Sequence, residues 1–201
     1  MVLRGALDEA FCRRTLQEMQ SAQWEDKGLP TGRDRGRDPL RQQTVSNPTA
    51  PWETACTAAL TRILAEHDLL GGTQVADLQG LQSLPQPEFD PDAAIDSEDV
   101  TGGAQKIHTD YDPDAFKEYM ETHEPADAPS SIMFDVMGGT RLPLRPYDGV
   151  WILVELDIGD VLIFRGDVEH YGVGYAERHL RGHARKHGAD FKKDKPSIYT
   201  K

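Results

Sequence analysis

The sequence predicts a mainly β fold: an antiparallel sandwich or barrel in the C-terminal half, with α-helices of the N-terminal half packed outside it. From about Gln105 onward, short apolar runs alternate with glycine-containing turns, a pattern typical of many short strands. The apolar runs cover residues 132–136, 150–156, 161–164 and 180–185. Before Gln105, apolar residues recur with a helical period instead.

Two helices are expected before the strands. Over residues 7–19, the apolar side chains lie close to a single stripe of a helix. The second helix covers residues 53–70, where apolar residues again recur about one helical turn apart. Pro51 suits the first turn of this helix, and Gly71 suits its end.

The length of 201 residues suits one domain with a sizeable core. Within this domain, we expect residues 1–100 to form a helical and loop region that packs on the core. Residues 101–186 would form the β core itself, and residues 187–201 a tail. The sequence contains no internal repeat and no long low-complexity tract.

Three segments are expected to be loops. Residues 28–48 hold arginines among Gly, Asp and Pro, and residues 85–99 are rich in Pro and Asp. Residues 111–130 are acidic and follow a candidate site described below. We interpret this last segment as a lid over that site.

The net charge of −12 is concentrated in the middle of the chain, because residues 51–128 hold three Lys and Arg against seventeen Asp and Glu. Such a surface repels phosphate, which argues against duplex nucleic acid as a partner. The acidic residues either form a solvated surface or steer a basic substrate.

Other classes of protein lose support from composition and motifs. No run approaches eighteen apolar residues, so the sequence predicts no membrane span and no signal peptide. Two cysteines, Cys12 and Cys56, suit a cytoplasmic or other reducing intracellular compartment, and both are expected to be buried in helices. Nucleotide-binding glycine motifs and the serine-hydrolase motif are absent.

The most informative residues are His108 and Asp110. If they lie on a strand, their side chains point to the same face. A third ligand from a neighbouring strand would complete a metal site, and His170, which follows the run 161–164, is the best candidate. Two histidines and one carboxylate form the facial triad of non-heme Fe(II) oxygenases. The alternative interpretation is a surface pair on an edge strand.

Arg181 lies eleven residues after His170. A buried guanidinium near a cation site needs an anion, and a dicarboxylic co-substrate offers a carboxylate that arginine binds through two hydrogen bonds. On a strand, His183 shares a face with Arg181, so His183 is also assigned to co-substrate binding.

With these residues in place, the chain resembles the Fe(II)- and 2-oxoglutarate-dependent dioxygenases, closest to their prolyl-hydroxylase-like branch. The similarity rests on HTD at 108–110, GDVLIFRGDVEHYGVGY at 159–175 and RGH at 181–183. It implies a double-stranded β-helix, a cupin-like jelly roll, for the core. Residues 184–186 depart from the family pattern, which suggests that the last strand ends early.

The resemblance also implies the chemistry. His108, Asp110 and His170 would be the catalytic iron ligands, and Arg181 would bind the distal carboxylate of 2-oxoglutarate. Dioxygen would be consumed, succinate and CO2 released, and a C–H bond of an organic substrate hydroxylated, with ascorbate allowed as a reductant. The substrate is open among a protein side chain, an amino acid and a small metabolite.

Three rival functions are consistent with the same residues. A non-catalytic cupin-like protein would bind a metal or ligand without consuming oxygen. A zinc-dependent hydrolase or isomerase would use the same triad without redox chemistry. The DNA-repair branch of the superfamily is disfavoured, because the acidic middle third lacks the basic loops that a flipped base requires.

Overall fold

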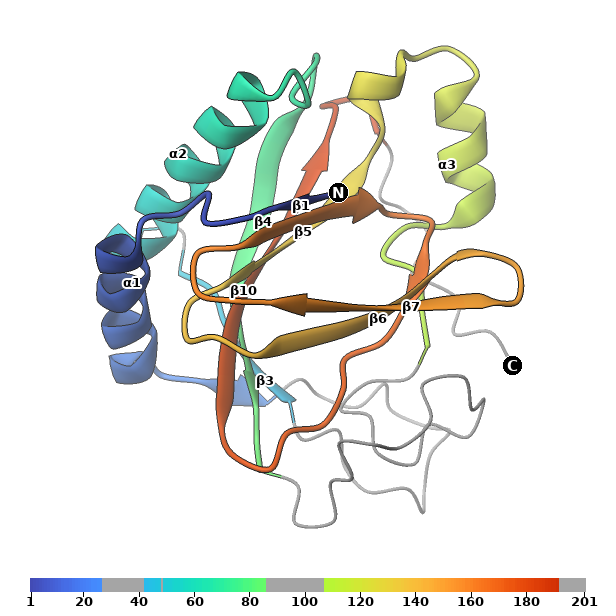
Figure 1. Cartoon of the computed structure of the whole chain (residues 1–201). Coiled ribbons are helices and arrows are strands. Elements are labelled where there is room, and N and C mark those ends of the chain that lie inside the picture. Colours follow the sequence, from blue (N-terminus) through green and yellow to red (C-terminus); the bar gives the residue numbers. More distant parts are fainter. Residues whose placement is uncertain (27–41, 48, 86–106, 192–201) are drawn as a thin grey trace.

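The computed structural model describes residues 1–26, 42–47, 49–85 and 107–191. Within them, the strands form a seven-stranded sheet with the order β1-β8-β5-β10-β4-β3-β2 and a three-stranded sheet with the order β7-β6-β9 (Figure 1). The strands are β1 (Val2–Leu3), β2 (Glu25–Asp26), β3 (Gln42–Val45), β4 (Gln74–Ser83), β5 (Ser130–Asp135), β6 (Thr140–Tyr147), β7 (Val150–Leu156), β8 (Val161–Arg165), β9 (Glu169–His170) and β10 (His179–His187). The helices are α1 (Glu9–Ser21), α2 (Pro51–Glu66), α3 (Pro113–Met120) and the 3-10 turn η1 (Pro125–Asp127).

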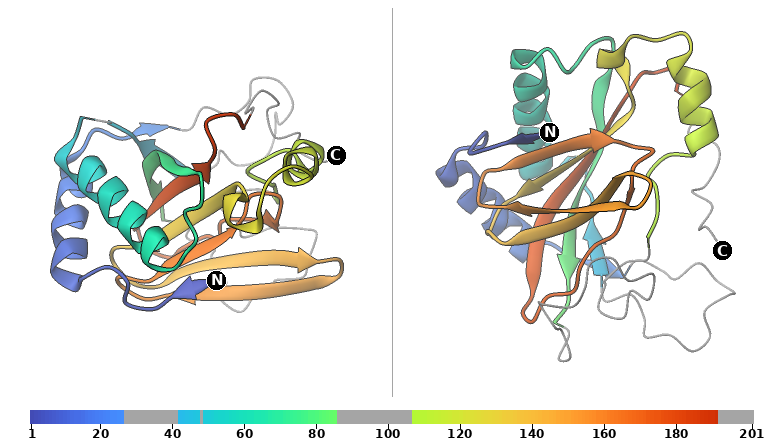
Figure 2. Two further views of the ribbon diagram at one scale, coloured as in Figure 1. Left: turned by 90° about the horizontal axis from the view of Figure 1, so that it is seen from above. Right: turned by 45° about the vertical axis from the view of Figure 1, so that its right-hand side comes forward.

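The two sheets pack face to face, and α1 and α2 cover the outer face of the larger sheet (Figure 2). Between the sheets lies an apolar cluster of Leu81, Met133, Leu142, Leu144, Leu156, Leu162 and Phe164. A second cluster joins the helices to the larger sheet and includes Leu60 and Leu64 of α2, Phe134 of β5 and Leu180 of β10. All paired strands run antiparallel within the described residues. This arrangement confirms the mainly β fold with flanking N-terminal helices.

The two predicted helices are confirmed with small shifts of their ends. The Asp8 side chain caps α1 by accepting hydrogen bonds from the amides of Ala10 and Phe11, which satisfies donors that a helix leaves unpaired. Pro51 occupies the first turn of α2 as expected. Cys12 and Cys56 are free thiols and are both buried in these helices.

The expectation that strands begin near residue 105 is wrong, because β1, β2, β3 and β4 all precede it. β4 is a central strand of the larger sheet, hydrogen-bonded to β10 on one side and to β3 on the other. Its buried apolar residues Val75, Leu78 and Leu81 are three positions apart, and Gln82 and Ser83 are buried polar residues. A pattern search for alternating apolar residues therefore passes over it. β3 falls inside residues 28–48, which were expected to be a loop; residues 27–41 and 86–106 lie outside the described part.

The segment 111–130 is not a simple loop, because it contains α3 and η1. Asp112 caps α3 by accepting hydrogen bonds from the amides of Asp114 and Ala115, and Pro113 occupies the first turn. The Asp-Pro pair therefore begins a helix. The role of this segment as a lid stays a prediction.

The expectation that the last strand ends early is also wrong, since β10 continues to His187. Lys186 is 3% exposed, and its ammonium donates hydrogen bonds to the carbonyls of Leu69 (2.8 Å) and Ala126 (2.6 Å). Burial lowers the pKa of Lys186 to about 8. Of the residues 187–201 expected as a tail, His187 therefore belongs to β10, and Phe191 packs edge-on against Tyr119. Among the described residues, no helix has the length and apolar character to span a membrane.

Gly182 marks the tightest packing along β10. It lies opposite Phe134 of β5, and a Cβ atom added there would be 1.9 Å from the Phe134 ring. We therefore expect Gly182→Ala to lower the free energy of unfolding by about 1–3 kcal/mol, because an overpacked core forces the strands apart. Urea unfolding followed by circular dichroism measures the change. Gly72→Ala is the control, since its Cβ would meet only Asp127 Oδ1 at 3.5 Å, and a loss of equal size there would contradict the prediction.

Candidate metal centre

The backbone brings His108 and His170 together directly. The amide of each residue donates a hydrogen bond to the carbonyl of the other, both at 2.9 Å, so the two form an isolated antiparallel bridge. His170 belongs to β9, which pairs with β6 in the smaller sheet. Opposed residues of an antiparallel pair project to the same face. The sequence prediction that His170 lies beside His108 on a neighbouring strand agrees with this placement.

Asp110 reaches the same place by a different route from the one expected. The chain leaves the bridge after His108 and bends at Asp110, and the amide of Tyr111 donates a hydrogen bond to the carbonyl of Gly166 (3.0 Å). The assumption that one strand carries both His108 and Asp110 is therefore wrong. Glycine is required at position 166, which faces Tyr111 across this contact, because an added Cβ would lie 1.8 Å from the Tyr111 ring.

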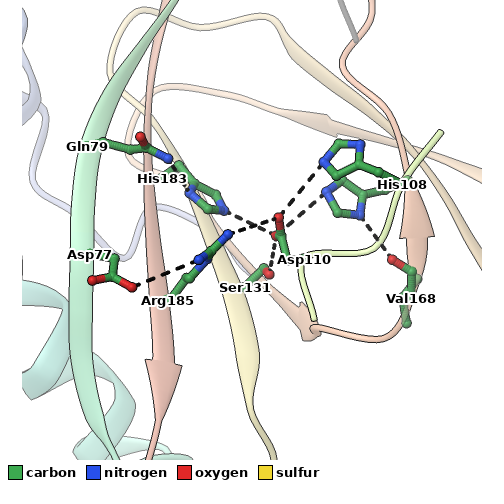
Figure 3. Close-up of polar contacts among 9 residues, drawn as sticks. Asp77, Gln79, His108, Asp110, Ser131, Val168, His183 and Arg185 are labelled. Carbon is green, nitrogen blue, oxygen red and sulfur yellow. Dashed lines mark hydrogen bonds and ion pairs between the residues drawn. The ribbon is translucent and has the colours of Figure 1, made fainter. Parts of the chain in front are cut away.

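The three side chains converge closely enough to hold an ion. Ligating atoms of His108, Asp110 and His170 all lie within 4.8 Å of one another. The Nε2 atom of His108 is 3.9 Å from Oδ1 of Asp110 (Figure 3), and that of His170 is 3.7 Å from Oδ2. His170 donates from Nδ1 to the carbonyl of Val168 (3.0 Å). Because a carbonyl only accepts, the proton sits on Nδ1, and the Nε2 lone pair faces the site.

The protonation states also suit a metal. Burial by itself would raise the pKa of Asp110, but the attraction of His170 in its protonated form, the hydrogen bond from His183 and the charge that His108 carries when protonated lower it well below its usual range. Burial lowers the pKa of His170. At neutral pH the site thus holds an ionised carboxylate and a neutral imidazole, which are the forms that coordinate metal ions.

Arg181 lies in the interior on β10, with 1% of its surface exposed. Its Nη1 donates to Ser83 Oγ (3.1 Å), and its guanidinium carbon lies 5.9 Å from the Tyr175 ring centroid. Among the described residues, its Nε and Nη2 atoms are buried and have no hydrogen-bond partner. Two free N–H donors on one planar group are what a carboxylate accepts.

His183 lies close to Asp110, with Nε2 3.3 Å from Oδ2. Its Nδ1 is 3.2 Å from Nε2 of Gln79 on β4. The structure thus places His183 beside a predicted metal ligand. Its predicted contact with the co-substrate stays a prediction.

Sequence reasoning missed three residues of this site: Gln79, Ser131 and Arg185. Ser131 on β5 donates a short hydrogen bond to Oδ2 of Asp110, and Nη2 of Arg185 lies 3.8 Å from Oδ1 (Figure 3). The alternation of β10 contained a signal for Arg185, because it shares a face with Arg181. Gln79 and Ser131 carry no such signal, since their role depends on which strands become neighbours.

Two arginines of β6 face acidic residues of neighbouring strands. Arg141 pairs with Glu155 of β7 at 3.1 Å. Arg145 forms an ion pair with Glu169 and lies over the Trp151 ring. Their charges are thus balanced within the smaller sheet.

Comparison with known proteins identifies the fold. No family model matches the chain, and no curated protein matches it. Among solved structures, a prolyl-4-hydroxylase from Pseudomonas putida is 14% identical with a TM-score of 0.58, covering 94% of this chain and 91% of its own. HygX from Streptomyces hygroscopicus, solved with nickel, 2-oxoglutarate and hygromycin B bound, is 12% identical with a TM-score of 0.64, covering 96% and 84%. The fold is that of the 2-oxoglutarate oxygenases.

A prolyl hydroxylase from Trichoplax adhaerens, solved with a peptide fragment of hypoxia inducible factor, extends this likeness at 9% identity and a TM-score of 0.61, covering 93% of this chain and 82% of its own. These alignments span nearly the whole chain, so the N-terminal elements belong to the shared fold as well. They confirm the double-stranded β-helix and the structural resemblance to Fe(II)- and 2-oxoglutarate-dependent dioxygenases.

His179 gives a prediction for stability against pH. Its Nε2 lies 2.9 Å from Thr140 Oγ1, and burial together with the charge of Arg181 lowers its pKa to about 4 from an ordinary 6.5. As the pH falls, His179 therefore becomes protonated near pH 6.5 in the unfolded chain but only near pH 4 in the folded protein. The free energy of unfolding falls as the pH falls between these two values. Relative to His179→Gln, we expect the wild type to lose about 3 kcal/mol of unfolding free energy between pH 7.5 and pH 4. Urea titrations at both pH values measure this difference, and parallel losses in the two proteins would contradict it.

Proposed function

We propose that this protein is an Fe(II)- and 2-oxoglutarate-dependent oxygenase that hydroxylates a C–H bond of an organic substrate. The observation that carries the proposal is the convergence of His108, Asp110 and His170 in the same interior as Arg181, a buried guanidinium with two free donors. The triad and the arginine each suit different reactants. The triad suits the metal and dioxygen, and the arginine suits the co-substrate.

The donor set fits iron. Two neutral imidazoles and one carboxylate on one side of an ion leave positions for a chelating co-substrate and dioxygen. When bound, iron and 2-oxoglutarate would supply the oxidation: dioxygen would give one oxygen atom to succinate as 2-oxoglutarate loses CO2, and the other to the substrate C–H bond.

Arg181 fits the distal carboxylate of 2-oxoglutarate. An uncompensated guanidinium in the interior is costly, and pairing it with a carboxylate through two hydrogen bonds removes that cost. Ser83 already holds the third nitrogen of the group, Nη1, so the fork is oriented before the ligand arrives. HygX, which shares this fold, was solved with 2-oxoglutarate bound, and this supports the assignment of the co-substrate here.

The remaining residues of the chain keep the site in a reactive form. Val168 holds the tautomer of His170, and the surrounding imidazoles keep Asp110 ionised. The side chains of His170 and Asp110 are 4% and 9% exposed and that of His108 is 16% exposed, which limits the contact of bulk water with the metal position. For the substrate we propose a protein side chain, an amino acid or a small metabolite, which the neighbours span: one was solved with hygromycin B and another with a peptide.

Loss of a metal ligand tests the proposed reaction. We expect His108→Ala and Asp110→Ala each to abolish the conversion of 2-oxoglutarate to succinate, with or without substrate, because two ligands do not retain iron in this geometry. Succinate is measured by mass spectrometry after aerobic incubation with Fe(II), 2-oxoglutarate and ascorbate. Asp114→Ala is the control, since Asp114 is an exposed residue in the first turn of α3.

Succinate formation at the wild-type rate in either ligand variant would remove the assignment. Metal binding by the wild type without oxygen consumption would instead favour a non-catalytic cupin-like protein. Activity with zinc in the absence of oxygen would favour a hydrolase or isomerase.

Removal of the guanidinium tests the co-substrate site separately. In an anaerobic titration of the Fe(II) protein, 2-oxoglutarate should produce a weak charge-transfer band in the visible spectrum. We expect Arg181→Ala to weaken this binding about 10- to 100-fold, because a charge-assisted pair of hydrogen bonds contributes about 1.5–3 kcal/mol. Arg181→Lys should recover part of the affinity, since it keeps the charge and loses the fork. Arg13→Ala, at an exposed position of α1, should titrate like the wild type, and an unchanged Arg181→Ala would overturn the assignment.

A further inference from the structure

We infer that His183 is a positioning residue for the metal site: together with Ser131 it holds Oδ2 of Asp110 and so leaves Oδ1 to face the ion. This inference rests on the proposed function, since it assumes that Asp110 is a metal ligand. It gives His183 a role other than contact with the co-substrate.

The two oxygens of Asp110 have different surroundings. Oδ2 accepts the hydrogen bond from Ser131 and lies 3.3 Å from Nε2 of His183. Oδ2 also lies 3.7 Å from Nε2 of His170, whereas the ion pairs of Oδ1 among the described residues are those with Arg185 (3.8 Å) and His108 (3.9 Å). Two hydrogen bonds thus occupy one oxygen, and the other is left with free lone pairs. The carboxylate is arranged to bind an ion through a single oxygen.

Gln79 determines which ring nitrogen of His183 carries the proton. Its amide nitrogen, Nε2, lies 3.2 Å from Nδ1 of His183. An amide nitrogen only donates, so Nδ1 accepts and the proton of the neutral ring sits on Nε2, directed at Asp110. His170 is the opposite case, because its Nδ1 donates to the Val168 carbonyl and its Nε2 has a free lone pair. The same side chain is therefore a ligand at position 170 and a hydrogen-bond donor at position 183.

The residues that hold Asp110, directly or through His183, come from the larger sheet. Gln79, Ser131 and His183 lie on β4, β5 and β10, which are adjacent in the larger sheet. Gln79 is the register partner of His183 across β4 and β10. Asp110 itself lies in a bend with no strand ladder to hold it. Hydrogen bonds to a metal ligand from residues that do not bind the metal orient that ligand. Residues of the larger sheet thus hold the Asp110 side chain, whose backbone lies outside the strands.

The affinity for Mn(II), measured by isothermal titration calorimetry without 2-oxoglutarate, tests this role. We expect His183→Ala to bind Mn(II) about 10- to 100-fold more weakly than the wild type, as for losses of groups that orient metal ligands. His183→Gln keeps an amide donor and should recover part of the affinity. His179→Gln is the matched control on the same strand and face, where the ring pairs with Thr140, and should bind as the wild type does. Thermal unfolding of each variant verifies that it is folded.

Gln79→Met provides a second test that does not alter His183 itself. It should weaken Mn(II) binding less than His183→Ala does, and the double variant should bind no more weakly than His183→Ala alone, because Gln79 acts through His183. If the losses of Mn(II) affinity in the two single variants add in the double variant, the proposal that Gln79 acts through His183 would be overturned. Wild-type affinity in His183→Ala would overturn the positioning role while the metal site stands. Absence of Mn(II) binding by the wild type would overturn the proposed function as well.

Proton NMR of the Co(II)-loaded protein separates a donor from a fourth ligand. Ring N–H protons of coordinated histidines are strongly shifted by the paramagnetic ion. We expect the wild type and His183→Gln to share the same set of shifted imidazole signals, arising from His108 and His170. A signal that disappears in His183→Gln would identify His183 as a ligand and overturn the inference.

Discussion

The reciprocal backbone pairing of His108 with His170 is the contact on which the candidate site depends. It joins positions sixty-two residues apart along the chain by two hydrogen bonds of 2.9 Å, and it sets both imidazoles on one face of the smaller sheet. Because the pairing uses main-chain groups, it does not depend on the identity of the side chains. The chain is therefore free to place ligands there without disturbing the sheet.

β10 connects this site to the rest of the fold. One face of the strand carries Leu180 and Ala184, which pack in the cluster shared with α1 and α2. The opposite face carries Arg181, His183 and Arg185 toward the interior. Period-two alternation thus lets a single strand contribute to the apolar core and to the polar site at once. Packing of the helices on one face holds the charged residues of the other face in place.

β5, β7, β8 and β10 were predictable as short apolar runs between glycine-containing turns, and both long helices from their apolar period, whereas β6 and β9 were not among the predicted runs. The members of the triad were predictable from residue type, spacing and family resemblance, although Asp110 reaches the site through a bend. β4 was not predictable in this way, since Gln82 and Ser83 are buried polar residues that interrupt its pattern. Such residues are stabilised inside a protein by partners from other strands, and those partners are not visible in a local window.

By itself, the sequence determined the strand periodicity, the two long helices and the presence of imidazole, carboxylate and guanidinium groups at suitable separations. Only the tertiary structure decided which partners each group meets. His170 and His183 are chemically identical side chains, yet one Nδ1 meets a carbonyl and the other meets an amide nitrogen. A carbonyl can only accept and an amide nitrogen can only donate, so the contact made by the far side of each ring selects its tautomer, and with it the role that we propose for each histidine.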